Sequence, residues 1–303
     1  MKIIITGGSG FIGSYLAMQL KKEHSVTIFD IKKNTSDIDF LEGDVTNLDS
    51  VKNSITDCDL VIHLAASLGV VNVERDPVQT LDINLGGTKN VLEACRTNNI
   101  KKIIFSSSSE IYGEPTKIPI GENDKPIPIT TYGISKLASE EYIKSYSKSY
   151  GIQYTIFRLF NVYGAIQDTQ WVLPEFVDKA ISNKQISVHS DGSQVRAFCY
   201  VSDVADAFQS VLEKANGEII NVGNDSNPIS IKELAEKIVS LTNSQSKIEF
   251  VPFEESNRNR TEILKRIPDI NKAKKILNYS PKITLDEGIK KVVKYRKEIN
   301  SDK

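Results

Sequence analysis

Apolar and polar positions divide the first half of the chain into short strand-like runs and longer amphipathic segments. The strand-like runs are continuous and rich in β-branched residues, as expected of strands that are buried on both faces. They lie at 3–5, 26–29, 60–63, 102–106 and 154–158. Helical patterns lie between them, most clearly at 12–20, 77–98 and 131–150. This alternation predicts an α/β fold with a doubly wound parallel sheet, in which ligands bind beyond the carboxyl ends of the strands.

The first strand runs into a glycine-rich turn, TGGSGFIG at 6–13. Glycines allow a tight turn and a close approach of the backbone to a pyrophosphate, which the N–H groups at the start of the following helix would bind. The second strand ends at Asp30. A carboxylate there can accept hydrogen bonds from both ribose hydroxyls of NAD and would repel the 2′-phosphate of NADP. This order of elements predicts a Rossmann-type dinucleotide site that prefers NAD.

The alternation ends near residue 165, where shorter strands and turns begin. A later run at 218–222 has the apolar character of the first strands, so the chain is expected to return there to the main sheet. We predict an NAD-binding Rossmann domain over 1–165, to which the chain returns near 197–230. Most of 166–303 is predicted to form a smaller C-terminal α/β lobe for the substrate.

Composition and charge weigh against several other classes of protein. The formal net charge of −1 gives no field that would gather nucleic acid or an anionic membrane surface. No apolar run is long enough to span a bilayer and no signal peptide precedes the first strand, so we expect a cytoplasmic protein. Cys58, Cys95 and Cys199 have no metal-ligand spacing and are expected to be reduced thiols. No metal site is predicted.

A candidate catalytic pair lies at the start of the helix predicted over 131–150. Tyr132 and Lys136 are four residues apart, which places them on one face of that helix. A neighbouring ammonium stabilises phenolate, so we expect Lys136 to lower the pKa of Tyr132 and to make it a base near neutral pH. The spacing alone also fits an amphipathic surface helix. Ser108, after the preceding strand, favours the catalytic interpretation because its hydroxyl could bind the same substrate hydroxyl.

In these residues the chain resembles the extended short-chain dehydrogenase/reductase family, in particular its nucleotide-sugar epimerases and dehydratases. The resemblance spans nearly the whole chain and depends on the order of its motifs. They are TGGSGFIG at 6–13, GDV at 43–45, HLAA at 63–66, SSSEIYGEP at 107–115, YGISK at 132–136, RLFNVYG at 158–164, RAFCYVSDVADA at 196–207 and PDINKAKKIL at 268–277. Ala165 departs from the family, in which proline commonly follows the asparagine motif, so the loop after it is not predicted from the resemblance.

The resemblance implies roles for the matching residues. Tyr132 would take the proton from a sugar hydroxyl, Lys136 would hold the nicotinamide ribose, and Ser108 would relay the proton. The implied NAD-binding residues are Gly7, Gly10, Phe11, Ile12, Gly13, Asp30, Asp44, Val45, Leu64, Ala65, Ala66, Asn84, Ser106, Tyr132 and Lys136. Asn161 and Arg196 would bind the nucleotide diphosphate, although a surface salt bridge is an alternative for Arg196. Arg260 and Arg266 are candidates for a second clamp on that diphosphate.

The reaction that the family implies begins with hydride transfer from C4 of a nucleoside-diphosphate sugar to NAD. Return of the hydride to the other face would make the protein a 4-epimerase. Loss of water would make it a 4,6-dehydratase, loss of a 6-carboxylate as carbon dioxide a UDP-glucuronate decarboxylase, and release of the keto sugar a C4 dehydrogenase. A non-catalytic NAD-binding scaffold is a remote alternative, because such relatives are expected to lack the pair Tyr132 and Lys136.

Glu110 distinguishes among these reactions. The thymidine-linked dehydratases resemble an Asp-Glu pair at this place, whereas this chain has Ser109-Glu110. Ser-Glu resembles the guanosine-linked dehydratases and the glucuronate decarboxylases, and Glu110 could also only order the turn that follows it. Because Glu110 has no partner carboxyl, we expect a 4-epimerase, with the other reactions as alternatives.

The family also implies a homodimer. The helix with Tyr132 and the helix corresponding to 82–98 would form a four-helix interface, with Tyr142 and Tyr146 as aromatic contacts. Specificity for the nucleotide and the sugar is expected in the loops at 67–76, 165–171 and 253–266.

Overall fold

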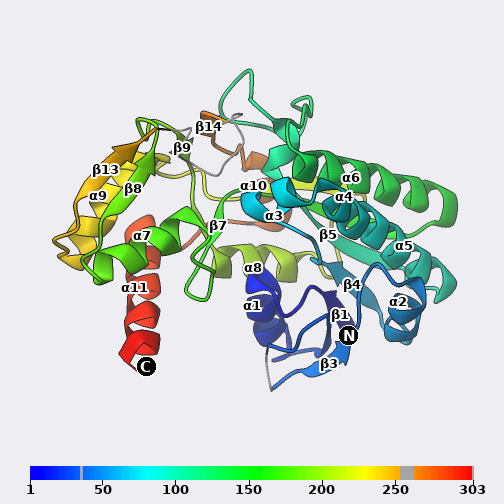
Figure 1. Ribbon diagram of the computed structural model, residues 1–303. Coiled ribbons are helices and arrows are strands. Elements are labelled where there is room, and N and C mark those ends of the chain that lie inside the picture. Colours follow the sequence, from blue (N-terminus) through cyan, green and yellow to red (C-terminus); the bar gives the residue numbers. More distant parts are fainter. Residues whose placement is uncertain (35–36, 253–262, 302–303) are drawn as a thin grey trace.

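The computed structural model describes residues 1–34, 37–252 and 263–301. Its largest element is a seven-stranded sheet in which every strand pair is parallel. The strands are β1 (Lys2–Thr6), β2 (Ser25–Asp30), β3 (Asp39–Glu42), β4 (Leu60–His63), β5 (Lys102–Ser108), β6 (Gln153–Leu159) and β11 (Glu218–Val222). Their order is β11-β6-β5-β4-β1-β2-β3 (Figure 1). The direction of this order reverses between β1 and β4, which is where doubly wound sheets bind their ligands.

The predicted doubly wound parallel sheet is therefore confirmed, and β11 lies beside β6. The edge strand β3 was not predicted, because it has only four residues, half of them are polar and most of them are exposed. The division of the chain near residue 165 stays a prediction.

Helices cover both faces of the sheet (Figure 1). One face carries α1 (Phe11–Leu20), α8 (Val201–Ser210) and α10 (Asn271–Leu277), whose apolar residues share one core with the strands. The other face carries α2 (Leu48–Ser54), α5 (Gly87–Thr97) and α6 (Thr131–Tyr150), which share a second core. Continuous apolar strands such as β1 are required by this arrangement, since neither face of the sheet meets water.

Helix α6 has the bounds that the sequence predicted, because both of its ends are encoded locally. The Thr130 hydroxyl accepts the Gly133 N–H at 2.9 Å and caps the first turn. At the other end Gly151 adopts a left-handed conformation with φ of 74°, which glycine allows without strain.

The helix predicted over 77–98 is confirmed from Pro77 to Thr97, but it is not a regular α-helix throughout. The segment is divided into α4 (Pro77–Leu81), a π-helical turn η1 (Asp82–Gly86) and α5. In the π turn the side chain of Asn84 is buried, donates to the Ser67 carbonyl and the Ser135 hydroxyl, and accepts the Ser67 N–H. These contacts join η1 to α6, so long-range polar bonding overrides the helical periodicity that the sequence displays.

A second lobe lies beside the sheet, away from α5 and α6 (Figure 1). Its own core joins α7 (Val172–Ile181), α9 (Ile231–Thr242) and α11 (Leu285–Ser301) to the parallel pair β8 (Ile186–His189) and β13 (Ile248–Val251). A small sheet of two-residue strands has the order β12 (Ile229–Ser230), β9 (Val195–Arg196) and β14 (Lys265–Arg266). Among the described residues, no helix has the length and apolar content needed to cross a membrane.

Candidate active site

A cavity of about 920 Å³ lies between the carboxyl ends of the main strands and the second lobe. Most of the residues predicted from the sequence line it. They are Gly7, Gly10, Phe11, Ile12, Gly13, Leu64, Ala66, Ser106, Ser108, Glu110, Tyr132, Lys136, Asn161, Arg196 and Arg266. Asp30, Asp44, Val45, Ala65 and Asn84 do not line it, and Arg260 lies outside the described residues.

One side of the cavity, formed by Gly7, Gly10, Phe11, Ile12 and Gly13, is here termed the glycine wall. Gly7 has a φ of +69°, and a Cβ there would lie 2.5 Å from the Ala65 nitrogen. A Cβ on Gly13 would lie 2.4 Å from the Gly7 carbonyl oxygen. Only glycine therefore allows β1, the turn and α1 to pack this closely, which leaves a backbone cradle at the N-terminus of α1 that fits a pyrophosphate.

Asp30 stands at the end of β2 and is tied to this wall. Its Oδ2 accepts the Ser9 N–H at 3.0 Å, and its Oδ1 accepts the Ile31 N–H at 2.8 Å. A carboxylate fixed beside the glycine turn fits the ribose of a dinucleotide. The Asp30 carboxylate and the backbone N–H groups of the glycine cradle together fit NAD.

Three other predicted cofactor residues do not line the cavity. Asp44 accepts the Thr46 N–H at 2.8 Å and so caps its own turn. Val45 is buried against Gly87, where a Cβ would approach its Cγ2 to 2.7 Å. The amide of Asn84 is occupied by the protein contacts described above, which gives it the geometry of a supporting residue.

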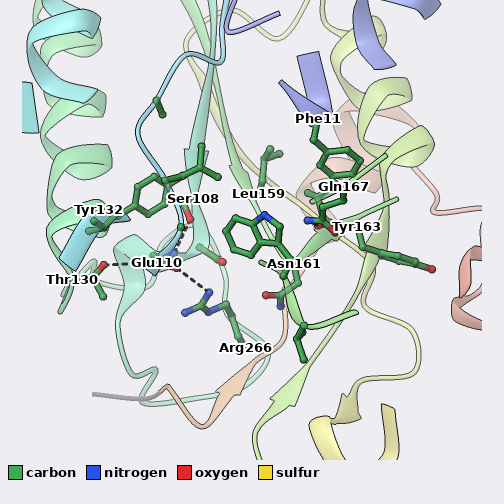
Figure 2. Close-up of a pocket in the computed structure, with 18 of the residues that line it drawn as sticks. Phe11, Ser108, Glu110, Thr130, Tyr132, Leu159, Asn161, Tyr163, Gln167 and Arg266 are labelled. Atoms are coloured by element: carbon green, nitrogen blue, oxygen red, sulfur yellow. Dashed lines mark hydrogen bonds and ion pairs between the residues drawn. The ribbon is translucent and has the colours of Figure 1, made fainter. Parts of the chain in front are cut away.

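Ser108, Tyr132 and Lys136 meet at the carboxyl end of β5. The Ser108 Oγ accepts the Glu110 N–H at 3.1 Å and caps the short helix η2 (Ser109–Tyr112). The Ser108 and Tyr132 side chains approach each other in Figure 2. Lys136 is buried and donates from Nζ to the Ser106 carbonyl at 2.7 Å. The predicted catalytic set is therefore brought together.

The predicted lowering of the pKa of Tyr132 by Lys136 is wrong in this arrangement. Burial raises the pKa of Tyr132, and the nearby Glu110 carboxylate raises it further. The Ser108 hydrogen bond and the charge of Arg266 act in the opposite direction. Lys136 Nζ lies 5.7 Å from the centroid of the Tyr132 ring, and its own pKa is lowered to about 7 by burial. An ammonium that lies at this distance and is directed at a backbone carbonyl stabilises phenolate weakly.

Among the described residues, the charged partner of Glu110 is a cation. Glu110 Oε2 accepts the Thr130 hydroxyl at 3.0 Å, and its Oε1 lies 3.7 Å from Nη1 of Arg266 (Figure 2). The main chain near Arg266 is held by the segment after η2, because Ile120 donates to the Ile267 carbonyl and accepts the Asp269 N–H. Sequence reasoning missed this pairing since the two residues lie on distant segments.

Arg196 and Arg266 also line the cavity and are here together termed the arginine wall. They are register partners on the parallel strands β9 and β14, so their side chains leave the sheet on the same face. Nη1 of Arg196 donates to the Val195 and Leu264 carbonyls. Nε of Arg266 is buried and has no hydrogen-bond partner within the described part of the chain.

Asn161 directly follows β6 and has a φ of +36°, a conformation that asparagine tolerates better than most residues. Its Nδ2 is buried without a hydrogen-bond partner among residues 1–34, 37–252 and 263–301. The cavity lining also includes residues of the second lobe that sequence reasoning did not assign. They include Phe176, Ser187, His189 and Gln194, whereas Gln167 lies in the loop 165–171 where specificity was expected. Their only signal in the sequence is their place beside the asparagine and arginine motifs.

Comparisons with known proteins assign the chain to a family. Residues 3–223 match the model of the NAD dependent epimerase/dehydratase family. Because the match covers well over half of the chain, the protein belongs to this family and is an NAD-dependent enzyme.

The most similar proteins include both epimerases and a decarboxylase. The chain is 36% identical to the UDP-N-acetyl-alpha-D-glucosaminuronate decarboxylase of Bacillus cytotoxicus over 99% of both chains. It is 38% identical to a putative UDP-glucose 4-epimerase of Methanocaldococcus jannaschii over 98% of this chain and 99% of that one. Among solved structures, the UDP-glucose 4-epimerase of Thermotoga maritima with UDP-glucose superposes with a TM-score of 0.93 at 30% identity, covering 99% of this chain and 100% of that chain.

Proposed function

We propose that this protein is an NAD-dependent nucleotide-sugar 4-epimerase, which oxidises C4 of a nucleoside-diphosphate sugar and returns the hydride to the opposite face. The observation that carries the proposal is the position of Ser108, Tyr132 and Lys136 in one cavity between the glycine wall and the arginine wall. One wall suits a dinucleotide and the other suits an anionic substrate.

NAD would be held by the glycine wall, the N-terminus of α1 and Asp30, with Lys136 near its nicotinamide ribose. When bound, NAD⁺ supplies the hydride acceptor at C4 of the sugar and a positive charge that favours phenolate. Such a charge is needed, because burial holds the pKa of Tyr132 above its usual range.

Tyr132 acts as the base that takes the proton of the C4 hydroxyl. The Ser108 oxygen accepts the backbone N–H of Glu110, so the Ser108 hydroxyl can donate its own proton to the phenolate or to the substrate. Lys136 is held at the Ser106 carbonyl and keeps a fixed donor beside the cofactor site. Turnover recycles the cofactor, since the hydride that leaves C4 is the one that returns.

The arginine wall suits the diphosphate of the substrate. Two guanidinium groups on neighbouring strands repel each other unless an anion lies between or before them. Guanidinium groups bind phosphate oxygens with paired N–H bonds. Asn161 adds an amide donor whose protein partner is missing within the described residues.

Decarboxylation of a nucleoside-diphosphate hexuronate is a second candidate function, and the pair Glu110 and Arg266 favours it. A 6-carboxylate could replace Glu110 as the partner of Arg266, which lines the same cavity. Once C4 is a ketone, that carboxylate is β to it and can leave as carbon dioxide. The similarity to the Bacillus cytotoxicus decarboxylase supports this alternative.

The deciding experiment incubates the purified protein with uridine, guanosine, cytidine and thymidine diphosphate sugars, including hexuronates, and follows product mass, retention and NADH absorbance. A product of unchanged mass and altered retention supports the 4-epimerase. Loss of carbon dioxide supports the second candidate, whereas loss of water or stoichiometric NADH contradicts both. Tyr132→Phe should lower turnover by about 10²- to 10⁴-fold, the usual contribution of a general base. Near-normal turnover of that variant would overturn the mechanism.

A homodimer through α5 and α6 is part of the proposal. Tyr142 and Tyr146 pack against the second core of their own chain, so they are only partly available to a partner. Tyr150 is 55% exposed on the same helix, and its ring lies 5.2 Å from that of Tyr146 and under Arg96. Light scattering across micromolar dilution tests this, and an exclusively monomeric mass would contradict it.

We also propose a cytoplasmic location. Three buried free thiols, Cys58, Cys95 and Cys199, suit a reducing compartment. Fractionation of the source cells tests it.

A further inference from the structure

A buried ion pair lies directly behind the proposed catalytic residues. Glu140 stands on α6, one turn beyond Lys136, and its side chain is fully buried. Its carboxylate accepts two hydrogen bonds from Arg158 on β6, one from Nε at 3.0 Å and one from Nη2 at 2.8 Å. The carboxylate oxygen Oε1 also accepts the hydroxyl of Ser107 on β5, at 2.5 Å. Glu140 therefore joins a helix and two strands through one charged group.

Ser107 stands between the two residues of β5 that the site uses. On one side the Ser106 carbonyl accepts the ammonium of Lys136. On the other side the Ser108 side chain lies beside that of Tyr132 (Figure 2). Consecutive residues of β5 thus meet α6 at three places. The middle tie is Glu140, which comes from the same helix as the other two partners.

Arg158 is itself held from a third direction. Its Nη1 donates to the Tyr112 hydroxyl at 2.9 Å and to the Glu122 carbonyl at 3.0 Å. The Tyr112 hydroxyl in turn donates to the Asn221 Oδ1 on β11 at 2.8 Å. Neither Glu140 nor Arg158 lines the cavity, so neither side chain reaches a ligand bound there.

We propose that Glu140 is a positioning residue, whose carboxylate holds β5 against α6 so that Ser108 stays in hydrogen-bonding reach of Tyr132. The inference rests on the proposed function, because it gives this hydrogen-bonded set a use in proton transfer. Stability alone explains the pair poorly, since apolar residues of similar volume stabilise a core at least as well as a buried ion pair. Its place behind the reacting groups indicates a geometric role. The negative charge of Glu140 also opposes the lowering of the pKa of Lys136 by burial.

Glu140→Gln tests the proposal, because it keeps the shape of the side chain and removes its charge. A displacement of the reacting groups by about 1 Å costs roughly 100-fold in rate, so we expect kcat to fall by about 10- to 100-fold. KM for the nucleotide sugar and the affinity for NAD should change little, since Glu140 touches neither ligand. In a crystal structure of the variant, the distance between the Ser108 and Tyr132 hydroxyls should be longer than in the wild type.

Two further variants separate positioning from stability. Ser107→Ala removes only the hydrogen bond from the Ser107 hydroxyl to Glu140, so it should lower kcat less than Glu140→Gln does. We expect this variant to fold, so it tests the proposal even if Glu140→Gln does not fold. Lys102→Met is the matched control, because Lys102 is buried at the opposite end of β5 and donates to the Val211 and Lys214 carbonyls at 2.6 and 2.7 Å. It should lower the melting temperature and leave kcat unchanged.

The outcomes are distinguishable. If Glu140→Gln and Ser107→Ala lower only the melting temperature, as Lys102→Met does, the positioning role is overturned and the proposed function stands. A wild-type protein that turns over none of the sugars overturns the proposed function instead. In that case the Ser108–Tyr132 distance in crystal structures of the wild type and Glu140→Gln still decides the geometric claim, and an unchanged distance refutes it.

Discussion

The glycine wall and the arginine wall line one cavity, but they are formed by segments of very different character. The glycine wall is a continuous stretch of sequence whose shape depends on the absence of side chains and on backbone N–H groups. The arginine wall joins two-residue strands from distant segments and acts through long charged side chains. The first is rigid because it is local and closely packed. The second depends on the docking of segments far apart in the chain.

Gly7→Ala should disrupt the glycine wall and leave the arginine wall intact. Of the substitutions compared below, it should have the largest effect on ligand binding. Its Cβ would lie 2.5 Å from the Ala65 nitrogen, at a φ that side chains rarely adopt. Strain of roughly 1–3 kcal/mol should weaken NAD binding by about 10- to 100-fold, measured by calorimetry. Gly86→Ala is the control, because its Cβ would have nothing within 4 Å. Equal NAD affinity in both variants would refute the close-approach explanation.

His63, the last residue of β4, should make the stability of the fold depend on pH. It is buried between the hydroxyls of Thr6 and Thr88, and burial, followed by the charge of Lys136, lowers its pKa to about 3. Below pH 6.5 the unfolded chain binds a proton that the folded chain does not, so stability falls as pH falls. The loss between pH 7 and pH 5 should be about 2 kcal/mol.

Urea unfolding of the wild type and of His63→Gln at both pH values measures this loss. The variant should lose about 2 kcal/mol less than the wild type on acidification. His24→Gln, at a partly exposed position, should behave as the wild type does. Parallel pH dependence in all three proteins would show that His63 contributes nothing to it.

Arg266→Met should break the arginine wall alone. Loss of a charged hydrogen-bond donor to the diphosphate is expected to raise KM for the nucleotide sugar by about tenfold or more, with unchanged NAD affinity. Steady-state kinetics measures the first and calorimetry the second. Lys265→Met removes the same charge from the neighbouring, exposed position of β14 and should leave KM near its normal value. Equal KM values for Arg266→Met and Lys265→Met would contradict a role of the arginine wall in substrate binding.

Asp30→Asn tests the cofactor side of the cavity, and its effect on dinucleotide affinity should be the smallest of these effects. The amide oxygen can still accept the Ser9 N–H, but the charge that repels the 2′-phosphate of NADP is removed. We expect NAD affinity to fall a few-fold and the preference for NAD over NADP to narrow. Fluorescence titration with both dinucleotides measures this, with Asp39→Asn on the exposed edge strand β3 as the control.

The sequence predicted what is encoded locally. The turn at 6–13 and both ends of α6 follow from neighbouring residues, and the structure has them as expected. The π turn at Asn84 was missed because its cause lies in contacts with Ser67 and Ser135. A helical period gives no sign of such long-range bonds.

The chemistry of the site divides in the same way. The spacing of Tyr132 and Lys136 correctly placed them on one helix, but it did not give the environment that raises the pKa of Tyr132. That pKa depends on burial, on Glu110 and on Arg266, which come together only in the folded chain. Pairing between Glu110 and Arg266 could not be predicted from the sequence, because no local pattern joins them.

The register of β14 beside β9 has a consequence for how the protein matures on the ribosome. All residues of the glycine wall, and the catalytic residues up to Lys136, leave the exit tunnel long before Arg266 does. The nascent chain can therefore hold its dinucleotide turn early, but the pair of guanidinium groups exists only after the C-terminal segment has docked on β9. The order of synthesis makes the substrate side of the cavity the last part to be assembled.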